Sequence, residues 1–370
     1  MPRRLMACLL TTTSLTLAAC GGPEPAASTA PAAPAPATTA AAPATSDAPA
    51  TKPLTATPVA IPQRQGDELL LAFAGDANAF KAAADSTEQG LGEAGRLLKA
   101  ADWSMVNLET ALADDQEGLT KQPKLYTFLT GRAFPQMLQR EGVDLVSLAN
   151  NHAMDFGVEG MKRTLKIRQD SELPMIGVGA SQDDAFRPWT GEVHGRQVVA
   201  LVGNDILESN MDWRPRDGRP GVAMVKTEEG FQTLVDGVAA QRREHPEAVV
   251  VVFMHWGVDY QVCTTGRQEK MAKKLADAGA SIVVGTHAHR VQRAETIGST
   301  YVAYGLGNFN FYSDRASTRE TGVLTVHVPR SGAPTAEWAP GRIVDGRPVM
   351  LTGAEAEAAR ERWAGLRGGC

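Results

Sequence analysis

The apolar run Ser281–Val284 leads into the sequence Gly–Thr–His–Ala–His, so that His287 and His289 stand one residue apart at its end. In a β-strand, residues i and i+2 point to the same face, and both imidazoles would then lie on one side of a sheet edge. Neutral imidazole is the commonest metal ligand in proteins. Two solvated histidines at a strand end would give the same pattern. The pair therefore indicates a metal site only if further ligands converge on it.

Further polar side chains stand where other apolar runs end. They are Asp76 after the first run, Asn107 and Glu109 after the second, Asn150, Asn151 and His152 after the third, and His255 after the fifth. Ligands of open α/β sheets bind beyond the carboxyl ends of the strands, so these strand ends can meet in one cleft. Asp, Glu, Asn and His gathered there predict a centre for divalent metal ions.

Each of these residues also has an explanation in structure alone. Asp76 follows a glycine and would suit a turn or a helix cap, and Asn150–His152 would suit a turn with left-handed backbone. Asp155 would cap the helix that follows it. His255 would fit a hydrogen-bonded core position. A purely structural interpretation would need every one of these separate explanations to be true at once. A shared functional site is therefore favoured.

Short apolar runs alternate with amphipathic stretches rich in Ala, Lys and Glu. The predicted strands are 68–74, 103–108, 145–148, 197–202, 248–254, 281–284, 300–304 and 322–328; the predicted helices are 90–100, 133–142, 157–169, 228–244, 266–278 and 353–366. This alternation is typical of an α/β layered fold with several strands buried on both faces. We expect one body over residues 66–351, followed by a C-terminal helix and tail over 352–370.

The N-terminal sequence predicts a targeting segment. Two arginines precede a mostly apolar stretch, and residues 1–19 end in Leu–Ala–Ala before Cys20, which resembles the lipobox of a bacterial lipoprotein signal peptide. A transmembrane anchor is the alternative, but the run is shorter than the roughly 20 apolar residues that span a bilayer. We expect a mature chain that begins at a lipidated Cys20, in the cell envelope, facing the periplasm or the exterior.

Residues 20–65 are almost wholly Ala, Pro, Thr and Ser, and Glu24, Asp47 and Lys52 are the charged residues between 21 and 63. Such a segment cannot bury a core, which predicts a disordered tether. A tether of some 40 residues would reach roughly 35 Å as a coil and about 120 Å when extended.

Composition limits the partners of the body that follows. The formal net charge is −5 and no basic block interrupts the sequence, which argues against nucleic acid as a partner. Beyond Cys20 the cysteines are Cys263 and Cys370. Two thiols make no thiolate metal site, although a single bridge between them would suit an oxidising compartment.

Taken together, these residues resemble the CapA family, the capsule synthesis and poly-γ-glutamate biosynthesis proteins of the calcineurin-like metallophosphoesterase superfamily. The similarity runs from about Glu68 to about Leu351, and the matching passages are Ala74–Asp76, Asn107–Thr110, Leu148–Gly157, Met254–Gln261, Leu275–His289 and Tyr304–Phe309. The resemblance implies a four-layer αββα sandwich of two mixed β-sheets flanked by helices. It also implies two divalent metal ions, drawn from Mn, Fe, Zn and Mg, at the sheet ends.

The family pattern gives these positions roles. It implies that Asp76 and His289 bind the first metal, that Glu109 bridges, that Asn151, His255 and His287 bind the second, that His152 donates a proton, and that Asp155 orients His152. Further neighbours of the metals or of the substrate would be Asn78, Asn107, Asn150, Trp256, Arg290 and Asn308.

Two departures from the wider superfamily leave the function open. Position 78 is Asn where the superfamily has the His of Asp-x-His, and Glu109 replaces Asp as the bridge. Both put the first metal position in question. The chain would be either a metal-dependent hydrolase or a non-catalytic scaffold of a polymer export or attachment complex. An amidohydrolase barrel fits poorly, because that fold places His-x-His on its first strand.

The expected substrate is an anionic extracytoplasmic polymer or a phosphoester, and the expected protein partners are those of polymer synthesis or export. Arg214, Arg216, Arg290 and Arg293 would engage its anionic groups, or would be ordinary solvated charges. Trp213 and Trp256 would form a platform beside the metals, or would pack in the core.

Overall fold

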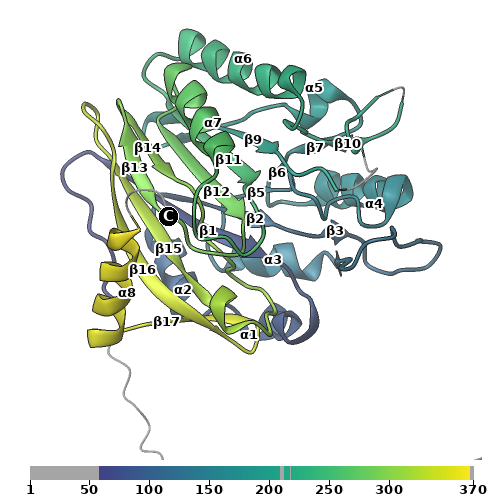
Figure 1. The fold of residues 1–370 in the computed structure, drawn as a ribbon, viewed down its shortest axis with the longest axis horizontal. Helices are drawn as coiled ribbons and strands as arrows, with labels where there is room; N and C mark the ends of the chain where they lie inside the picture. Colours follow the sequence, from purple (N-terminus) through teal and green to yellow (C-terminus); the bar gives the residue numbers. More distant parts are fainter. Residues whose placement is uncertain (1–57, 209–211, 217, 367–370) are drawn as a thin grey trace, which may run out of the picture. The chain divides into compact units, whose positions relative to one another are not determined.

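The computed structural model describes residues 58–208, 212–216 and 218–366 of the chain (Figure 1). The predictions for the signal peptide, the lipidated Cys20, most of the tether and Cys370 lie outside the described residues. The last residues of the expected tether, 58–65, do contact the body. Val59 packs against the core, and its backbone carbonyl accepts a hydrogen bond from Arg96. The chain is therefore attached to the body several residues before position 66.

Two mixed sheets form the centre of the described part. One sheet has the order β17 (Arg347–Met350), β16 (Thr335–Val344), β15 (Glu320–Val328), β1 (Leu69–Ala77), β2 (Trp103–Leu108), β5 (Leu145–Ser147) and β6 (Met175–Ile176). The other has the order β13 (Ala294–Ile297), β14 (Thr300–Ala303), β12 (Ile282–His287), β11 (Val249–Trp256), β9 (Arg196–Asn204) and β8 (Trp189–Val193). Two short pairs lie outside them, β3 (Ala111–Leu112) with β4 (Leu129–Thr130) and β7 (Val178–Gly179) with β10 (Gly221–Val222).

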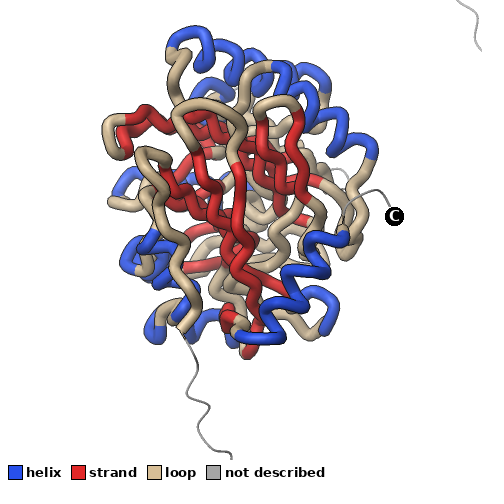
Figure 2. The backbone as a smooth tube through the Cα atoms, turned by 90° about the vertical axis from the view of Figure 1, so that its left-hand side faces the viewer, coloured by secondary structure: helices blue, strands red, loops and turns tan. Residues whose placement is uncertain are grey.

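The helices lie on the outer sides of the two sheets, as Figure 2 shows. They are α1 (Ser86–Gln89), α2 (Glu93–Ala100), α3 (Ala133–Arg140), α4 (Gly157–Asp170), α5 (Gln182–Ala185), α6 (Glu228–Glu244), α7 (Gly266–Asp277) and α8 (Gly353–Gly365), with 3-10 turns at Lys81–Asp85 and Ala316–Thr318. Helices α6 and α7 pack on β9, β11 and β12, and α2 packs on β1, β2 and β15 (Figure 1). The expected four-layer sandwich is confirmed.

Strand β11 shows why the apolar runs have no polar face. Val251 and Phe253 belong to the core between the two sheets, where Phe253 meets Phe73 of β1. Val250 and Val252 point the other way and pack under α6 and α7. Because successive strand residues alternate between faces, a strand covered on both sides must be apolar throughout.

The main predicted elements are present, and the strands that sequence reasoning missed lie mainly at edges. β16 and β17 extend the first sheet beyond β15 by antiparallel pairing. Their residues alternate between more and less buried positions, and the strands contain Pro340 and Pro348, a residue type that sequence patterns rarely assign to strands. The expected C-terminal helix is α8, and it packs on β16 with Trp363 against Trp338. Helix and sheet thus belong to one compact unit.

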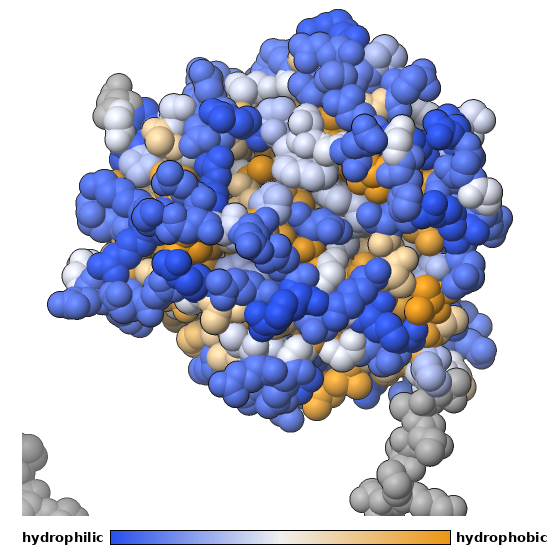
Figure 3. All heavy atoms as spheres, turned by 180° about the vertical axis from the view of Figure 1, so that it is seen from behind, coloured by the Kyte–Doolittle hydropathy of each residue, from blue (hydrophilic) through white to orange (hydrophobic). Residues whose placement is uncertain are grey.

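One face of the described part is mainly polar. On the face seen in Figure 3, hydrophilic side chains dominate and apolar ones show in small patches between them. No helix among the described residues is long and apolar enough to cross a membrane.

Candidate metal centre

Parallel pairing brings the polar strand ends to one place. At the end of the first sheet, Asp76 of β1 pairs with Asn107 of β2, and Glu109 follows one residue after β2. In the second sheet, His255 of β11 pairs with Thr286, next to His287 of β12. The Oδ2 atom of Asp76 accepts a hydrogen bond from the backbone N–H of His287 at 3.1 Å, which joins the two sheets at the site.

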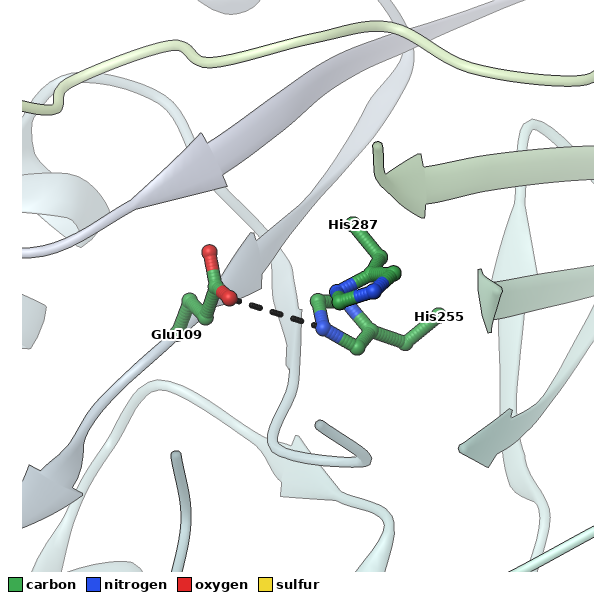
Figure 4. Close-up of side chains that lie close together, drawn as sticks. All are labelled: Glu109, His255 and His287. Carbon is green, nitrogen blue, oxygen red and sulfur yellow. Dashed lines mark ion pairs between the residues drawn. The ribbon is translucent and has the colours of Figure 1, made fainter. Parts of the chain in front are cut away.

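Two groups of possible ligand atoms form there. Glu109, His255 and His287 make one group, and in each group the ligand atoms lie within 4.8 Å of one another. Asp76, Glu109 and His289 make the other. Figure 4 shows the carboxylate of Glu109 facing the imidazoles of His255 and His287. Glu109 belongs to both groups, so its carboxylate would be available to a cation in either one.

The chain bends sharply through the histidine pair, which corrects the regular strand geometry expected from the sequence. His287 has a φ of 87° and His289 a φ of 52°, both in the left-handed region that bulky residues rarely adopt. Their ring centres lie 6.1 Å apart, and the two rings belong to different ligand groups. Backbone strain of this kind persists at sites where function over-determines the geometry.

The donor set fits divalent cations. Both carboxylate oxygens of Glu109 and Nδ1 of His287 are buried without a hydrogen-bond partner among the described residues. Burial raises the pKa of the Glu109 carboxyl well above its ordinary value, and the nearby Asp76 raises it further. Burial also raises the pKa of Asp76. Buried carboxylates that lack counter-charge normally pair or coordinate a metal.

His255 is held in the orientation that a ligand needs. Its Nδ1 lies 3.1 Å from the hydroxyl of Thr286, and that hydroxyl hydrogen-bonds Asp76. Its Nδ1 also lies 3.2 Å from Nδ2 of Asn107. Its Nε2 faces Oδ1 of Asn151 at 2.8 Å and Oε1 of Glu109 at 3.5 Å. When Nε2 is unprotonated, these three atoms would present three acceptors to a cation. Burial lowers the pKa of His255 well below its ordinary value, so the ring stays neutral.

His152 and Asp155 form the expected pair. Nδ1 of His152 lies 2.7 Å from Oδ2 of Asp155, so Nε2 is left to face Glu109, at 3.8 Å from Oε1. The ring of Phe128 packs on the imidazole with centres 4.3 Å apart. Burial lowers the pKa of His152, and the Asp155 carboxylate opposes that shift.

Amide side chains connect the ligands behind the centre. Nδ2 of Asn107 donates to Oδ1 of Asp76 at 2.8 Å, and Nδ2 of Asn150 donates to Oδ1 of Asn107 at 3.2 Å. At the other side, Oδ1 of Asn308 accepts a hydrogen bond from Nδ1 of His289 at 2.7 Å, which fixes the orientation of that ring. Of the six neighbours expected from the sequence, Asn107 and Asn308 therefore contact the ligand groups directly, and Asn150 reaches them through Asn107.

The other three neighbours do not. Asn78 accepts the N–H of Phe80 through its side chain. Trp256 is fully buried, stacks on Tyr304 and donates to its backbone carbonyl, so the core alternative holds. Arg290 donates to the backbone of Tyr260 and is not among the residues that line the pocket.

The remaining side chains proposed for the pocket mouth lie elsewhere. Arg214 and Arg216 pair with Asp212, and Arg293 pairs with Glu269 and Glu295. Trp213 packs in the core. These three arginines pair with local acids, which the sequence alone does not reveal.

A pocket of about 570 Å³ opens in front of the centre and is lined by Asn151, His152, His287 and His289. Its other walls include residues that sequence reasoning missed: Lys81, Lys124, Phe128, Glu208, Asp259 and Arg315. Apart from Asp259, which lies in a matching passage without an assigned role, they stand in loops that carry no strand-end pattern. A volume of this size suits a small molecule or one unit of a larger chain.

Two packed sheets between helices, with carboxylates and imidazoles at the strand ends, define an α/β sandwich with a candidate metal centre. The family model described as "Bacterial capsule synthesis protein PGA_cap" matches residues 70–313. The chain belongs to this family, and the expected family resemblance is confirmed.

Two curated relatives show the extent of the similarity. The "PGA biosynthesis protein CapA" of Bacillus subtilis is 28% identical over 69% of this chain and 65% of its own length. The "Capsule biosynthesis protein CapA" of Bacillus anthracis is 27% identical over 70% of this chain and 62% of its own length. The chain thus spans less than two thirds of either relative. A solved phosphatase from Mycoplasma pneumoniae is 11% identical with a TM-score of 0.46, over 80% of this chain and 98% of that one.

Proposed function

We propose that this chain is a lipid-anchored, extracytoplasmic, metal-dependent hydrolase that acts in the metabolism of capsule, poly-γ-glutamate or a related anionic surface polymer. One observation carries the hydrolase part: two buried ligand groups share Glu109, whose oxygens have no hydrogen-bond partner among the described residues. The names of the relatives support the polymer part. The lipid anchor rests on the sequence around Cys20.

Asp76, Glu109 and His289 would hold one ion, and Glu109, Asn151, His255 and His287 would hold the other. Divalent cations would acidify a water and offset the negative charge that develops on the substrate's oxygens. A side chain of the protein would transfer the proton.

His152 is the residue that moves the proton. Its hydrogen bond to Asp155 fixes the ring, so that Nε2 faces the centre and can pass a proton to the leaving group. The packed ring of Phe128 excludes water from one face of the imidazole.

The pocket also offers cations for an anionic substrate. The ammonium of Lys81 lies 4.3 Å from the ring centre of Tyr312, and the guanidinium of Arg315 lies 4.4 Å from that of Tyr260. Aromatic rings hold a cation in place without cancelling its charge. Lys81 and Arg315, rather than the arginines suggested by the sequence, are therefore the side chains proposed to bind carboxylates or phosphates of the polymer.

The test uses the purified full chain, stripped by a chelator and then supplied with Mn²⁺, Zn²⁺ or Mg²⁺. We expect hydrolysis of an aryl phosphodiester or a γ-glutamyl amide to return with one of these ions. The H152A variant should lose about 10²- to 10⁴-fold in kcat while it keeps its metal. Failure to bind any metal would disprove the proposal.

H152A, together with the variant H289A, distinguishes a hydrolase from a non-catalytic scaffold. If the protein is a non-catalytic component of an export or attachment complex, H152A and H289A will fold, reach the envelope and leave polymer production unchanged. Loss of polymer with intact folding and localisation supports the hydrolase.

A further inference from the structure

Asn151 is the one amide among the proposed ligands, and an amide can face a cation in two ways. Its Oδ1 is an acceptor that binds a cation, whereas its Nδ2 carries two protons that repel one. The two orientations fill nearly the same space, so packing alone does not choose between them. A neighbouring group has to fix the amide.

Glu208 supplies this constraint. Its Oε1 accepts a hydrogen bond from Nδ2 of Asn151 at 2.8 Å. A carboxylate only accepts hydrogen bonds, so it selects the NH2 end of the amide. The opposite end, Oδ1, then lies 2.8 Å from Nε2 of His255, on the side of the ligand group.

Lys124 holds Glu208 and Asn151 together. Its Nζ lies 3.0 Å from the same Oε1 of Glu208 and donates to the backbone carbonyl of Asn151 at 2.7 Å. The Lys124 side chain is only 4% exposed and also pairs with Asp155. A buried ammonium with three acceptors has little freedom to move away. It therefore joins three separate loops in the pocket wall.

We propose that Glu208, held by Lys124, positions the Asn151 amide and so sets the affinity of the metal position at His255 and His287. The inference rests on the metal binding in the proposed function, but not on the bond that is hydrolysed. Groups that orient metal ligands change metal affinity by about 10- to 100-fold when they are removed.

The experiment titrates Mn²⁺ into the chelator-stripped full chain and counts the sites and their affinities. Glu208→Leu removes the acceptor, and one of the two affinities should fall by about 10- to 100-fold while the other stays unchanged. Glu208→Gln keeps an acceptor oxygen, so its affinities should stay close to wild type. Glu172→Leu, which changes an exposed loop glutamate after α4, is the matched control.

A second substitution tests the amide itself. Asn151→Asp replaces the amide by a carboxylate, which has no NH2 end to misorient. In that background Glu208→Leu should cost much less Mn²⁺ affinity than it does with Asn151 present. A role of Glu208 in folding alone would not depend on the residue at position 151.

Three results would overturn the inference: unchanged affinity in Glu208→Leu, equal losses in Glu208→Gln and Glu208→Leu, or no difference between the two backgrounds. Absence of Mn²⁺ binding in the wild type would overturn both this inference and the proposed function. Normal binding without hydrolysis would overturn the hydrolase and leave the positioning role of Glu208 supported.

Discussion

Without a cation, the environment of Glu109 destabilises the ionised form of its carboxylate. Glu109 is completely buried beside a second buried carboxylate, Asp76, and its oxygens lack hydrogen-bond donors among the described residues. The folded protein therefore disfavours the ionised form of Glu109, which is why its pKa is raised. A site built to hold a metal lowers the stability of the metal-free protein.

This cost predicts an opposite effect of E109Q on stability and on metal binding. The pKa of the Glu109 carboxyl is higher in the folded protein than its ordinary value of 4.5, so its contribution to stability is fully present when the pH is below 4.5. That contribution is lost as the pH rises. Gln does not ionise, so E109Q avoids the loss. In chelator, its Tm should match wild type near pH 4.5 and exceed it at neutral pH, while Mn²⁺ binding is abolished.

Thermal unfolding of both proteins across the pH range, with and without Mn²⁺, checks this. With Mn²⁺ the order should reverse, because only the wild type gains the binding free energy. If E109Q were less stable than wild type in chelator at every pH, Glu109 would have to be stabilised by groups other than a cation.

At the scale of elements, the sequence was informative where each apolar run ends in a polar residue. Strands β1, β2, β11 and β12 were predicted, and Asp76, Glu109, His255 and His287 gather at their ends. The reason is physical: a strand buried on both faces is a continuous apolar run, and a polar residue after it marks the sheet edge.

Loop residues were not predictable in the same way. Lys124 stands in the long connection between β3 and β4, and Glu208 in the connection after β9. Neither connection has a periodic pattern, so nothing in the sequence places these two side chains beside Asn151. The positive φ angles of His287 and His289 were also invisible, since regular strand geometry was the starting assumption.

Gly285 offers a test of how tightly β12 is packed behind the histidines. A Cβ at this position would lie 2.1 Å from the carbonyl oxygen of Tyr304 and 2.2 Å from Nε1 of Trp256. These two atoms form a hydrogen bond of 2.8 Å. G285A should therefore lower the free energy of unfolding by about 1–3 kcal/mol, as overpacked cores do, and should weaken Mn²⁺ binding through His287.

Gly266 provides the matched control in chemical denaturation. It begins α7, and a Cβ there meets no atom within 4 Å. G266A should leave the free energy of unfolding unchanged or raise it by up to about 1 kcal/mol. Equal stabilities of G285A and G266A would show that β12 can shift away from Tyr304.

At the scale of the whole molecule, the site and the proposed anchor lie far apart in the sequence. Between Gly21 and Pro53 the sequence contains no Val, Leu, Ile, Met, Phe, Trp or Tyr. If Cys20 carries the proposed lipid, a linker of this composition would hold the body near a membrane and would span roughly 35 Å as a coil. Lipid on Cys20 would therefore determine where the hydrolase works and leave its metal centre unchanged.

C20A separates these two properties in the full chain expressed in a bacterium with its envelope intact. We expect the variant to move from the membrane to the soluble fraction and to lack the mass of attached lipid, because a single residue supplies the anchor. Its Mn²⁺ affinity and its kcat on a small soluble phosphodiester should equal those of wild type. Membrane association of C20A in high salt would instead indicate an uncleaved apolar segment as the anchor, since salt screens electrostatic attachment but not apolar insertion.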